Sequence, residues 1–228
     1  MCIRDSYKVV DVQNKILGLT GYLGAVVYYG ILYTGQMQYV TLLTIAFLVV
    51  LMAVYVFSFP TFKAEQVMTV FFGVCYVAVM LSYVSQTRML EDGAVAVWLI
   101  FLSSWGCDTC AYCVGVLIGK HKMAPILSPK KSVEGGIGGI VGAALIGILY
   151  ALAVNYWGNA GEDVLRYAII GAAGGAISQI GDLAASAIKR YHNIKDYGKL
   201  IPGHGGILDR FDSVIFTAPI IYYLALFL

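Results

Sequence analysis

Seven long apolar stretches recur along the chain, and they restrict it to one class of fold. They lie roughly at residues 16–34, 39–57, 67–84, 94–118, 137–157, 166–188 and 213–228. Inside hydrocarbon, a stretch of this length satisfies its backbone hydrogen bonds as a helix. Charged residues make up only 12% of the 228 residues, about half of what a soluble domain carries. The sequence therefore predicts an all-α, polytopic integral membrane bundle with about seven transmembrane helices.

The lysines and arginines are divided unevenly between the two sides of such a bundle. With the amino terminus inside, Arg88 and Arg166 are the only two of 15 Lys and Arg residues that lie outside. Loops beside membrane helices carry an excess of Lys and Arg on the cytoplasmic side. This pattern predicts that the loops 119–136 and 189–212 share the cytoplasmic face.

We expect two regions along the chain. Residues 1–93 contain three spans without a chemical motif, so we interpret them as structural. Residues 94–228 contain the polar segments, and we interpret them as the catalytic region with its two cytoplasmic loops.

The most polar part of the chain is the segment 181–213, which connects two apolar stretches. Asp182, Ser186 and Lys189 are spaced i, i+4, i+7 and would share one face of a helix. A carboxylate near a membrane boundary is costly, and it is a functional candidate unless it is paired. The Pro-Gly-His-Gly-Gly turn at 202–206 can offer backbone N–H groups to phosphate oxygens.

Asp209 and Asp212 follow this turn at a spacing that places them on one helix face. Carboxylates beside several cations suit Mg²⁺ and a phosphate ligand that completes its coordination. We expect Asp182, Asp209 and Asp212 to meet as ligands of one Mg²⁺ centre, with a second metal ion left open. The alternative is a solvated, positive-inside loop in which acids simply pair with bases.

A second polar position lies inside the apolar stretch 94–118. Asp108 is either a packing acid bonded to a neighbour or part of a site. Cys107, Cys110 and Cys113 form a C-x2-C-x2-C run beside it. On a helix they spread over about a third of the surface, and no fourth ligand is near. We therefore interpret them as small residues at helix contacts and reject a metal cluster.

The run S-x-x-K-R-x4-K-D, followed by P-G-H-G-G-x-x-D-R-x-D, resembles the signature of the phosphatidate cytidylyltransferases, also called CDP-diacylglycerol synthases. The stretches W-x-x-D-x-x-A-Y with G-K-H-K at 105–122, and S-P-K-K-S-V-E-G-G at 128–136, resemble further parts of that family. The signature positions are Ser186, Lys189, Arg190, Lys195, Asp196, Pro202, His204, Gly205, Gly206, Asp209, Arg210 and Asp212.

The resemblance implies condensation of CTP with phosphatidate at the cytoplasmic membrane face, release of pyrophosphate and dependence on Mg²⁺. The catalytic residues that we expect are Asp182, Lys189, Asp209, Arg210 and Asp212. The substrate-binding residues that we expect are Asp108, Ser128, Lys130, Lys131, Ser132, Glu134, Ser186, Arg190, Lys195, Asp196, Gly203, His204, Gly205 and Gly206. The expected partners are CTP, phosphatidate and membrane lipid, without nucleic acid, and a homodimer is left open.

Two other functions are left open. One is a CTP-dependent transferase that acts on a different lipid phosphate, such as an ether lipid. The other is an ion-coupled transporter that uses Asp108 and Asp182, although paired broken helices at the membrane midplane are not evident. Members of the family often carry further amino-terminal helices, so we expect this chain to be either shortened or a short member.

Overall fold

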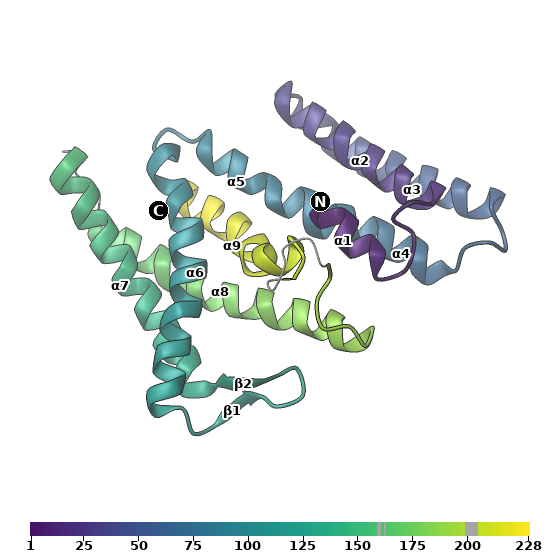
Figure 1. The fold of residues 1–228 in the computed structure, drawn as a ribbon. Helices are drawn as coiled ribbons and strands as arrows, with labels where there is room; N and C mark the ends of the chain where they lie inside the picture. The colour runs from purple at the N-terminus through teal and green to yellow at the C-terminus, as the bar shows by residue number, and fades with distance from the viewer. Residues whose placement is uncertain (159–160, 162, 199–204) are drawn as a thin grey trace. The chain divides into compact units, whose positions relative to one another are not determined.

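The computed structural model describes residues 1–158, 161, 163–198 and 205–228. Most of these residues are helical, and one short hairpin interrupts the helices (Figure 1). The helical elements are α1 (Cys2–Lys8), α2 (Ile16–Tyr33), the 3-10 turn η1 (Met37–Tyr39), α3 (Val40–Phe57), α4 (Ala64–Gly73), the π-helical η2 (Val74–Val79), α5 (Met80–Arg88), α6 (Gly93–Ile118), α7 (Val133–Gly158), α8 (Val164–Tyr191) and α9 (Leu208–Phe227). The strands are β1 (Lys122–Ala124) and β2 (Ser128–Ser132).

Seven helical stretches among the described residues are long and apolar enough to cross a membrane. They correspond to the seven predicted stretches, with α4, η2 and α5 joined into one span, Ala64–Arg88. The prediction of an all-α polytopic membrane protein is therefore confirmed.

Several helices continue beyond their apolar stretches into polar sequence. α8 continues to Tyr191, and α9 begins at Leu208, so Lys189, Asp209 and Asp212 are helical. Helix propagation needs only backbone hydrogen bonds, and charged side chains at a membrane surface remain hydrated. Hydropathy alone therefore places these helix ends too far inside the spans.

The chain divides into two compact units. The first contains residues 1–82 and 195–210, and the second contains residues 83–194 and 211–228. This division reflects which residues pack against one another. The functional division expected at residue 93 stays a prediction.

The first unit has an apolar core contributed by α1, α2, α3 and α4. Tyr7 is fully buried in it, and its hydroxyl donates a hydrogen bond to the carbonyl of Val70 at 2.9 Å. The buried carboxylate of Asp5 accepts a hydrogen bond from the backbone N–H of Ile207 at 3.0 Å. This contact joins the segment 195–210 to α1.

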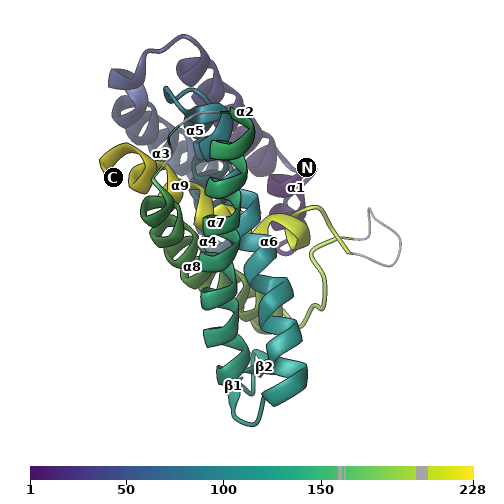
Figure 2. The same ribbon diagram turned by 90° about the vertical axis from the view of Figure 1, so that its left-hand side faces the viewer.

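In the second unit, α6, α7 and α8 lie side by side (Figures 1 and 2). Small residues allow them to approach closely, as is common between membrane helices. A Cβ atom at Gly139 of α7 would lie 2.9 Å from the sulfur of Cys107, and one at Gly142 would lie 2.5 Å from the sulfur of Cys110. Two of the three cysteines in the C-x2-C-x2-C run therefore lie at a helix contact.

The loop 119–136 contains a feature that the sequence analysis missed. β1 and β2 form an antiparallel hairpin in which Lys122 pairs with Ser132. The hairpin continues directly into α7, so Lys130 and Lys131 immediately precede a transmembrane helix. Short polar strands lack a clear apolar alternation, and their pairing depends on residues ten positions apart.

Replacement of Gly139 by Leu should destabilise the second unit. The larger side chain would force α6 and α7 apart, at a cost typical of overpacking, about 1–3 kcal/mol. Gly30 on α2 provides a matched control, since a Cβ atom there has no neighbour within 4 Å. Samples in detergent would be heated and then analysed by size-exclusion chromatography. The temperature that halves the height of the monodisperse peak should fall for Gly139→Leu and not for Gly30→Leu. Equal transitions would contradict the close contact.

Candidate functional site

A cavity of about 600 Å³ lies in the second unit, among α6, α7, α8 and the hairpin. Its volume is typical of small-molecule sites. Two carboxylates, Asp108 and Asp182, and three lysines, Lys122, Lys130 and Lys131, contribute to its lining. The charged lining therefore has an excess of one positive charge. Such a cavity suits an anionic ligand.

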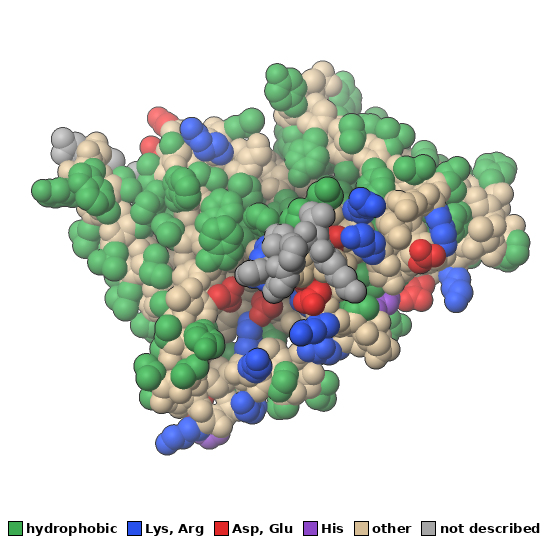
Figure 3. All heavy atoms as spheres, viewed as in Figure 1, with side chains coloured by type: hydrophobic (Ala, Val, Ile, Leu, Met, Phe, Trp, Pro, Cys, Tyr) green, Lys and Arg blue, Asp and Glu red, His purple; other side chains and the backbone are tan. Residues whose placement is uncertain are grey.

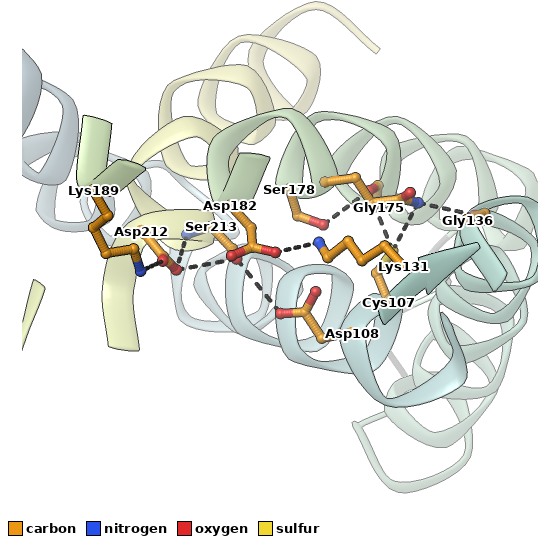
Figure 4. Close-up of polar contacts among 11 residues, drawn as sticks. Cys107, Asp108, Lys131, Gly136, Gly175, Ser178, Asp182, Lys189, Asp212 and Ser213 are labelled. Atoms are coloured by element: carbon orange, nitrogen blue, oxygen red, sulfur yellow. Dashed lines mark hydrogen bonds and ion pairs between the residues drawn. The ribbon is translucent and has the colours of Figure 1, made fainter. Parts of the chain in front are cut away.

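α8 and β2 meet inside the cavity through an ion pair. Lys131 Nζ contacts Asp182 Oδ2, and these side chains are 25% and 27% exposed (Figure 4). Lys131 was predicted to bind substrate and Asp182 to bind a metal ion, so the structure brings together residues from two separate motifs. Because both groups stay partly exposed, a ligand entering the cavity can reach either of them.

Ser213 of α9 connects two further carboxylates. Its hydroxyl donates to Asp108 Oδ2 at 3.5 Å, and its backbone N–H donates to Asp212 Oδ1 at 2.8 Å. Asp212 is buried and lies 3.9 Å from Lys189 Nζ. In Figure 4, Asp108, Asp182 and Asp212 extend from three helices towards the same region around Ser213. The structure therefore places Asp108 beside two of the predicted catalytic acids.

A glycine brings α8 and α9 together at this point. A Cβ atom at Gly181 would lie 2.9 Å from the backbone carbonyl oxygen of Asp212. This distance is shorter than real Cβ contacts allow, so the backbones can only meet here without a side chain. Asp182, the next residue, and Asp212 are thereby held on neighbouring helices.

Gln179 is a lining residue that the sequence analysis missed. Its amide donates to the carbonyl of Gly136 at 2.9 Å and to the sulfur of Cys107 at 3.4 Å. The Gln179 side chain is buried, and it links α8 with both α7 and α6. A signal was present, because Gln179 lies three residues before Asp182 and therefore on the same helix face.

Two predicted substrate residues help to shape the entrance to α7. Ser132 lines the cavity, and its hydroxyl accepts a hydrogen bond from the N–H of Gly135 at 3.2 Å. Glu134 accepts hydrogen bonds from the N–H groups of Lys120 and His121, at 3.1 and 3.2 Å, and contacts His121 Nδ1 at 2.6 Å. Glu134 therefore connects the end of α6 to the start of α7 and does not line the cavity.

Other predicted residues lie away from the cavity or in the first unit. Asp209 accepts hydrogen bonds from the N–H groups of Tyr197 at 2.9 Å and Gly206 at 3.0 Å. Ser128, Ser186, Lys189 and Arg190 belong to the second unit and do not line the cavity. Lys195, Asp196, Gly205, Gly206, Asp209 and Arg210 belong to the first unit. Gly203 and His204 lie outside the described residues. The meeting of Asp182, Asp209 and Asp212 therefore stays a prediction.

The carboxylates in and beside the cavity suit a metal ion whose coordination is completed by water and by phosphate oxygens of the substrates. Within the described ranges, no group of three or more His, Cys, Asp or Glu residues could hold a metal ion by itself. Mg²⁺ commonly uses one or two protein carboxylates and completes its coordination with water and phosphate oxygens. Asp182, which lines the cavity, and Asp212, which extends towards the same region in Figure 4, provide the hard oxygen donors that this requires.

Comparison with known proteins gives a consistent result. The model of the cytidylyltransferase family matches residues 4–228. The chain is 40% identical over 149 residues to the phosphatidate cytidylyltransferase of Staphylococcus haemolyticus. The aligned segment covers 65% of this chain and 55% of that protein. It is 33% identical over 218 residues to the phosphatidate cytidylyltransferase of Bacillus subtilis, covering 92% and 80% of the two chains. The chain thus spans about half the length of the staphylococcal relatives, 55% in each case.

Replacement of Gln179 by Leu should destabilise the helix contacts around the cavity. The buried carbonyl of Gly136 would lose its donor, which typically costs about 1–3 kcal/mol. Gln36→Leu is the control, because Gln36 is exposed and its side chain forms no hydrogen bond that caps the start of η1. Thermal unfolding in detergent should show a lower midpoint for Gln179→Leu alone. An unchanged midpoint would show that this hydrogen bond contributes little to the packing.

Proposed function

The chain belongs to the cytidylyltransferase family, and we propose that it is a phosphatidate cytidylyltransferase. In this reaction a phosphate oxygen of phosphatidate forms a bond to the α-phosphorus of CTP. The bond from that phosphorus to the oxygen bridging to the β-phosphorus breaks, and pyrophosphate leaves with the electron pair. The products are CDP-diacylglycerol and pyrophosphate.

The observation that best supports this proposal is the cavity where Lys131 meets Asp182. Both substrates carry phosphate groups and one of them is a membrane lipid. A cavity formed by transmembrane helices and lined by three lysines suits such ligands. Phosphoryl and nucleotidyl transfer depend mainly on positioning and on compensation of phosphate charge, and this lining provides both.

We assign phosphate binding to Lys130 and Lys131 on the hairpin, together with Lys122, which the sequence analysis did not single out. Neither Lys122 nor Lys130 forms an ion pair with any described residue. Their ammonium groups therefore remain available to an entering anion. The remaining signature cations, Lys189, Arg190, Lys195 and Arg210, are proposed to bind the triphosphate, and their contribution rests on the family resemblance.

Asp182 and Asp212 are the residues that we propose to hold Mg²⁺, with Asp209 as a further ligand on the strength of the signature. When bound, the ion would neutralise negative charge on the reacting phosphates. The ammonium group of Lys189 partly neutralises the charge of the buried Asp212 carboxylate. The backbone N–H of Ser213 orients the same carboxylate through a hydrogen bond. A second metal ion and a homodimer stay predictions.

The proposed orientation places the hairpin and its lysines on the cytoplasmic side, because Lys and Arg concentrate there. In Figure 3 the part of the surface that carries the hairpin shows blue Lys and Arg side chains, whereas the flank formed by α7 is mostly green. In this orientation the cavity among α6, α7, α8 and the hairpin lies towards the cytoplasmic side, where the proposed reaction would take up CTP.

A turnover assay tests this assignment directly. Purified protein in detergent would receive labelled CTP, Mg²⁺ and either phosphatidate or an ether-lipid phosphate, with ATP, GTP and UTP in parallel reactions. CTP-dependent formation of CDP-diacylglycerol is the expected result. A product that forms only from the ether lipid would favour the alternative transferase, and no lipid product with any nucleotide would refute the proposal.

Asp182→Asn and Asp212→Asn should each lower turnover by at least about 100-fold, the loss expected when a central electrostatic group is removed. The amide keeps the shape of the side chain but not its charge. Asp163→Asn is the matched control, because Asp163 caps the start of α8 through the N–H of Leu165 and Asn caps equally well. Elution profiles should be the same for all three variants. Turnover of either site variant near that of the wild type would remove that residue from the proposed role.

Removal of divalent cations by a chelator should abolish turnover, and added Mg²⁺ should restore it. Ca²⁺ prefers more ligands and longer bonds, so it should restore turnover poorly. The elution profile of the chelated protein should not change, because the ion is expected to enter with the substrate phosphates. Full turnover in chelator would rule out the metal-dependent mechanism.

A further inference from the structure

A single carboxylate closes the base of the hairpin. Glu134 Oε2 accepts hydrogen bonds from the backbone N–H groups of Lys120 and His121, at 3.1 and 3.2 Å, and Glu134 Oε1 contacts His121 Nδ1 at 2.6 Å. Lys120 and His121 directly follow Gly119, the residue that caps α6, whereas Glu134 is the second residue of α7. The N–H of Val133 also donates to the carbonyl of His121 at 2.9 Å. Side-chain and backbone contacts therefore join the two ends of the hairpin segment.

The backbones beside this carboxylate are closely packed. A Cβ atom at Gly119 would lie 2.5 Å from Ser132 Oγ, and one at Gly135 would lie 3.1 Å from the Cα atom of Gly115 on α6. Larger residues at these positions would push the end of α6 away from the start of α7. Ser132 and Gly135 line the cavity, whereas Glu134, which lies between them in the sequence, does not. The base of the hairpin is therefore a closely packed part of the cavity wall.

The carboxylate of Glu134 is engaged by donors of the protein itself. Both of its oxygens have partners, namely two backbone N–H groups and a ring nitrogen. Hydrogen bonds from backbone N–H groups to an ionised carboxylate are about twice as strong as those between neutral groups. Phosphate carries the same sign of charge as this carboxylate, so direct contact between them would be repulsive. Glu134 is thus better suited to hold the chain than to make the substrate contact expected from the sequence.

The residues that precede Glu134 include two lysines of the cavity. Lys130 and Lys131 lie on β2, and both line the cavity. Lys131 Nζ contacts Asp182 on α8. A lysine ammonium group is carried by a flexible four-carbon stem, so the position of its backbone limits where the charge can lie. Glu134 holds that backbone from the side of α7.

We propose that Glu134 is a positioning residue for the reaction, which holds the hairpin lysines at the cavity without touching either substrate. This inference rests on the proposed function for the identity of the phosphates that the lysines bind. Loss of the carboxylate would release Lys120 and His121, so that β2 could shift relative to α8. A misplacement of about 1 Å at a distance from the chemistry can cost about 100-fold in rate.

Three variants test this role by turnover. Glu134→Ala removes every side-chain contact at the hairpin base and should lower kcat/KM for CTP about 100-fold. Glu134→Gln keeps a carbonyl oxygen that can accept from the same N–H groups, so it should lower kcat/KM by no more than about 10-fold. Glu65→Ala is the matched control, because Glu65 is exposed and is likewise the second residue of an apolar span. Assays well below the unfolding midpoint of every variant separate this effect from a loss of stability alone.

A second measurement needs no turnover. An amine-reactive reagent would modify the protein in detergent, with and without pyrophosphate and Mg²⁺. Peptide mass spectrometry would quantify modification of Lys130 and Lys131 relative to Lys63, an exposed lysine of the first unit. Pyrophosphate should protect both hairpin lysines in the wild type, in Glu134→Gln and in Glu65→Ala, but not in Glu134→Ala. Equal protection in all four proteins, or none in the wild type, would overturn the positioning role.

The two proposals can fail separately. If Glu134→Ala alone loses protection but the wild type forms no CDP-diacylglycerol, the positioning role stands and the proposed function is wrong. If product forms and Glu134→Gln is as slow as Glu134→Ala, the charge of Glu134 acts on the substrates directly and the positioning role is wrong. If product forms and all variants turn over like the wild type, the function stands and the positioning role is again wrong.

Discussion

The site depends on how closely α8 approaches its neighbours. A Cβ atom at Gly175 would lie 2.8 Å from the Cβ of Ala143 on α7, and one at Gly181 would lie 2.9 Å from the backbone of α9. At these points α8 carries no side chain, so its backbone comes close to the neighbouring helices. Charged side chains from neighbouring residues, such as Asp182, can therefore reach across to other helices. Larger residues here would separate the carboxylates from the lysines.

Ion pairing explains how a charged side chain is tolerated inside a membrane protein. A lone carboxylate at such a depth is costly, and Asp182 avoids this cost by pairing with Lys131. A partly exposed pair of this kind contributes little to folding stability. In the proposed reaction this pair would exchange its partners, because an entering phosphate would bind the lysine while an accompanying cation would bind the aspartate. Neither charge would then be left unpaired during the proposed exchange.

The sequence was sufficient to predict the seven spans, because hydropathy over about 20 residues reflects a requirement of the bilayer itself. It was also sufficient for the family, since the motif around Lys189 and Asp212 has many fixed positions. The hairpin and Gln179 were missed for a physical reason: their roles arise from contacts between distant segments, Gln179 with Gly136 for example. Asp209 illustrates the same limit, since its backbone contacts with Tyr197 and Gly206 depend on loop geometry and not on helix periodicity.

The direct passage from β2 into α7 has a mechanical consequence. Lys130 and Lys131 precede the first residue of α7 by only a few positions, and Glu134 fastens that first turn to Lys120 and His121 at the end of α6. The backbone of these lysines is therefore anchored to two transmembrane helices, α6 and α7. A tilt of α6 or α7 in the bilayer would therefore move the backbone of these lysines with it.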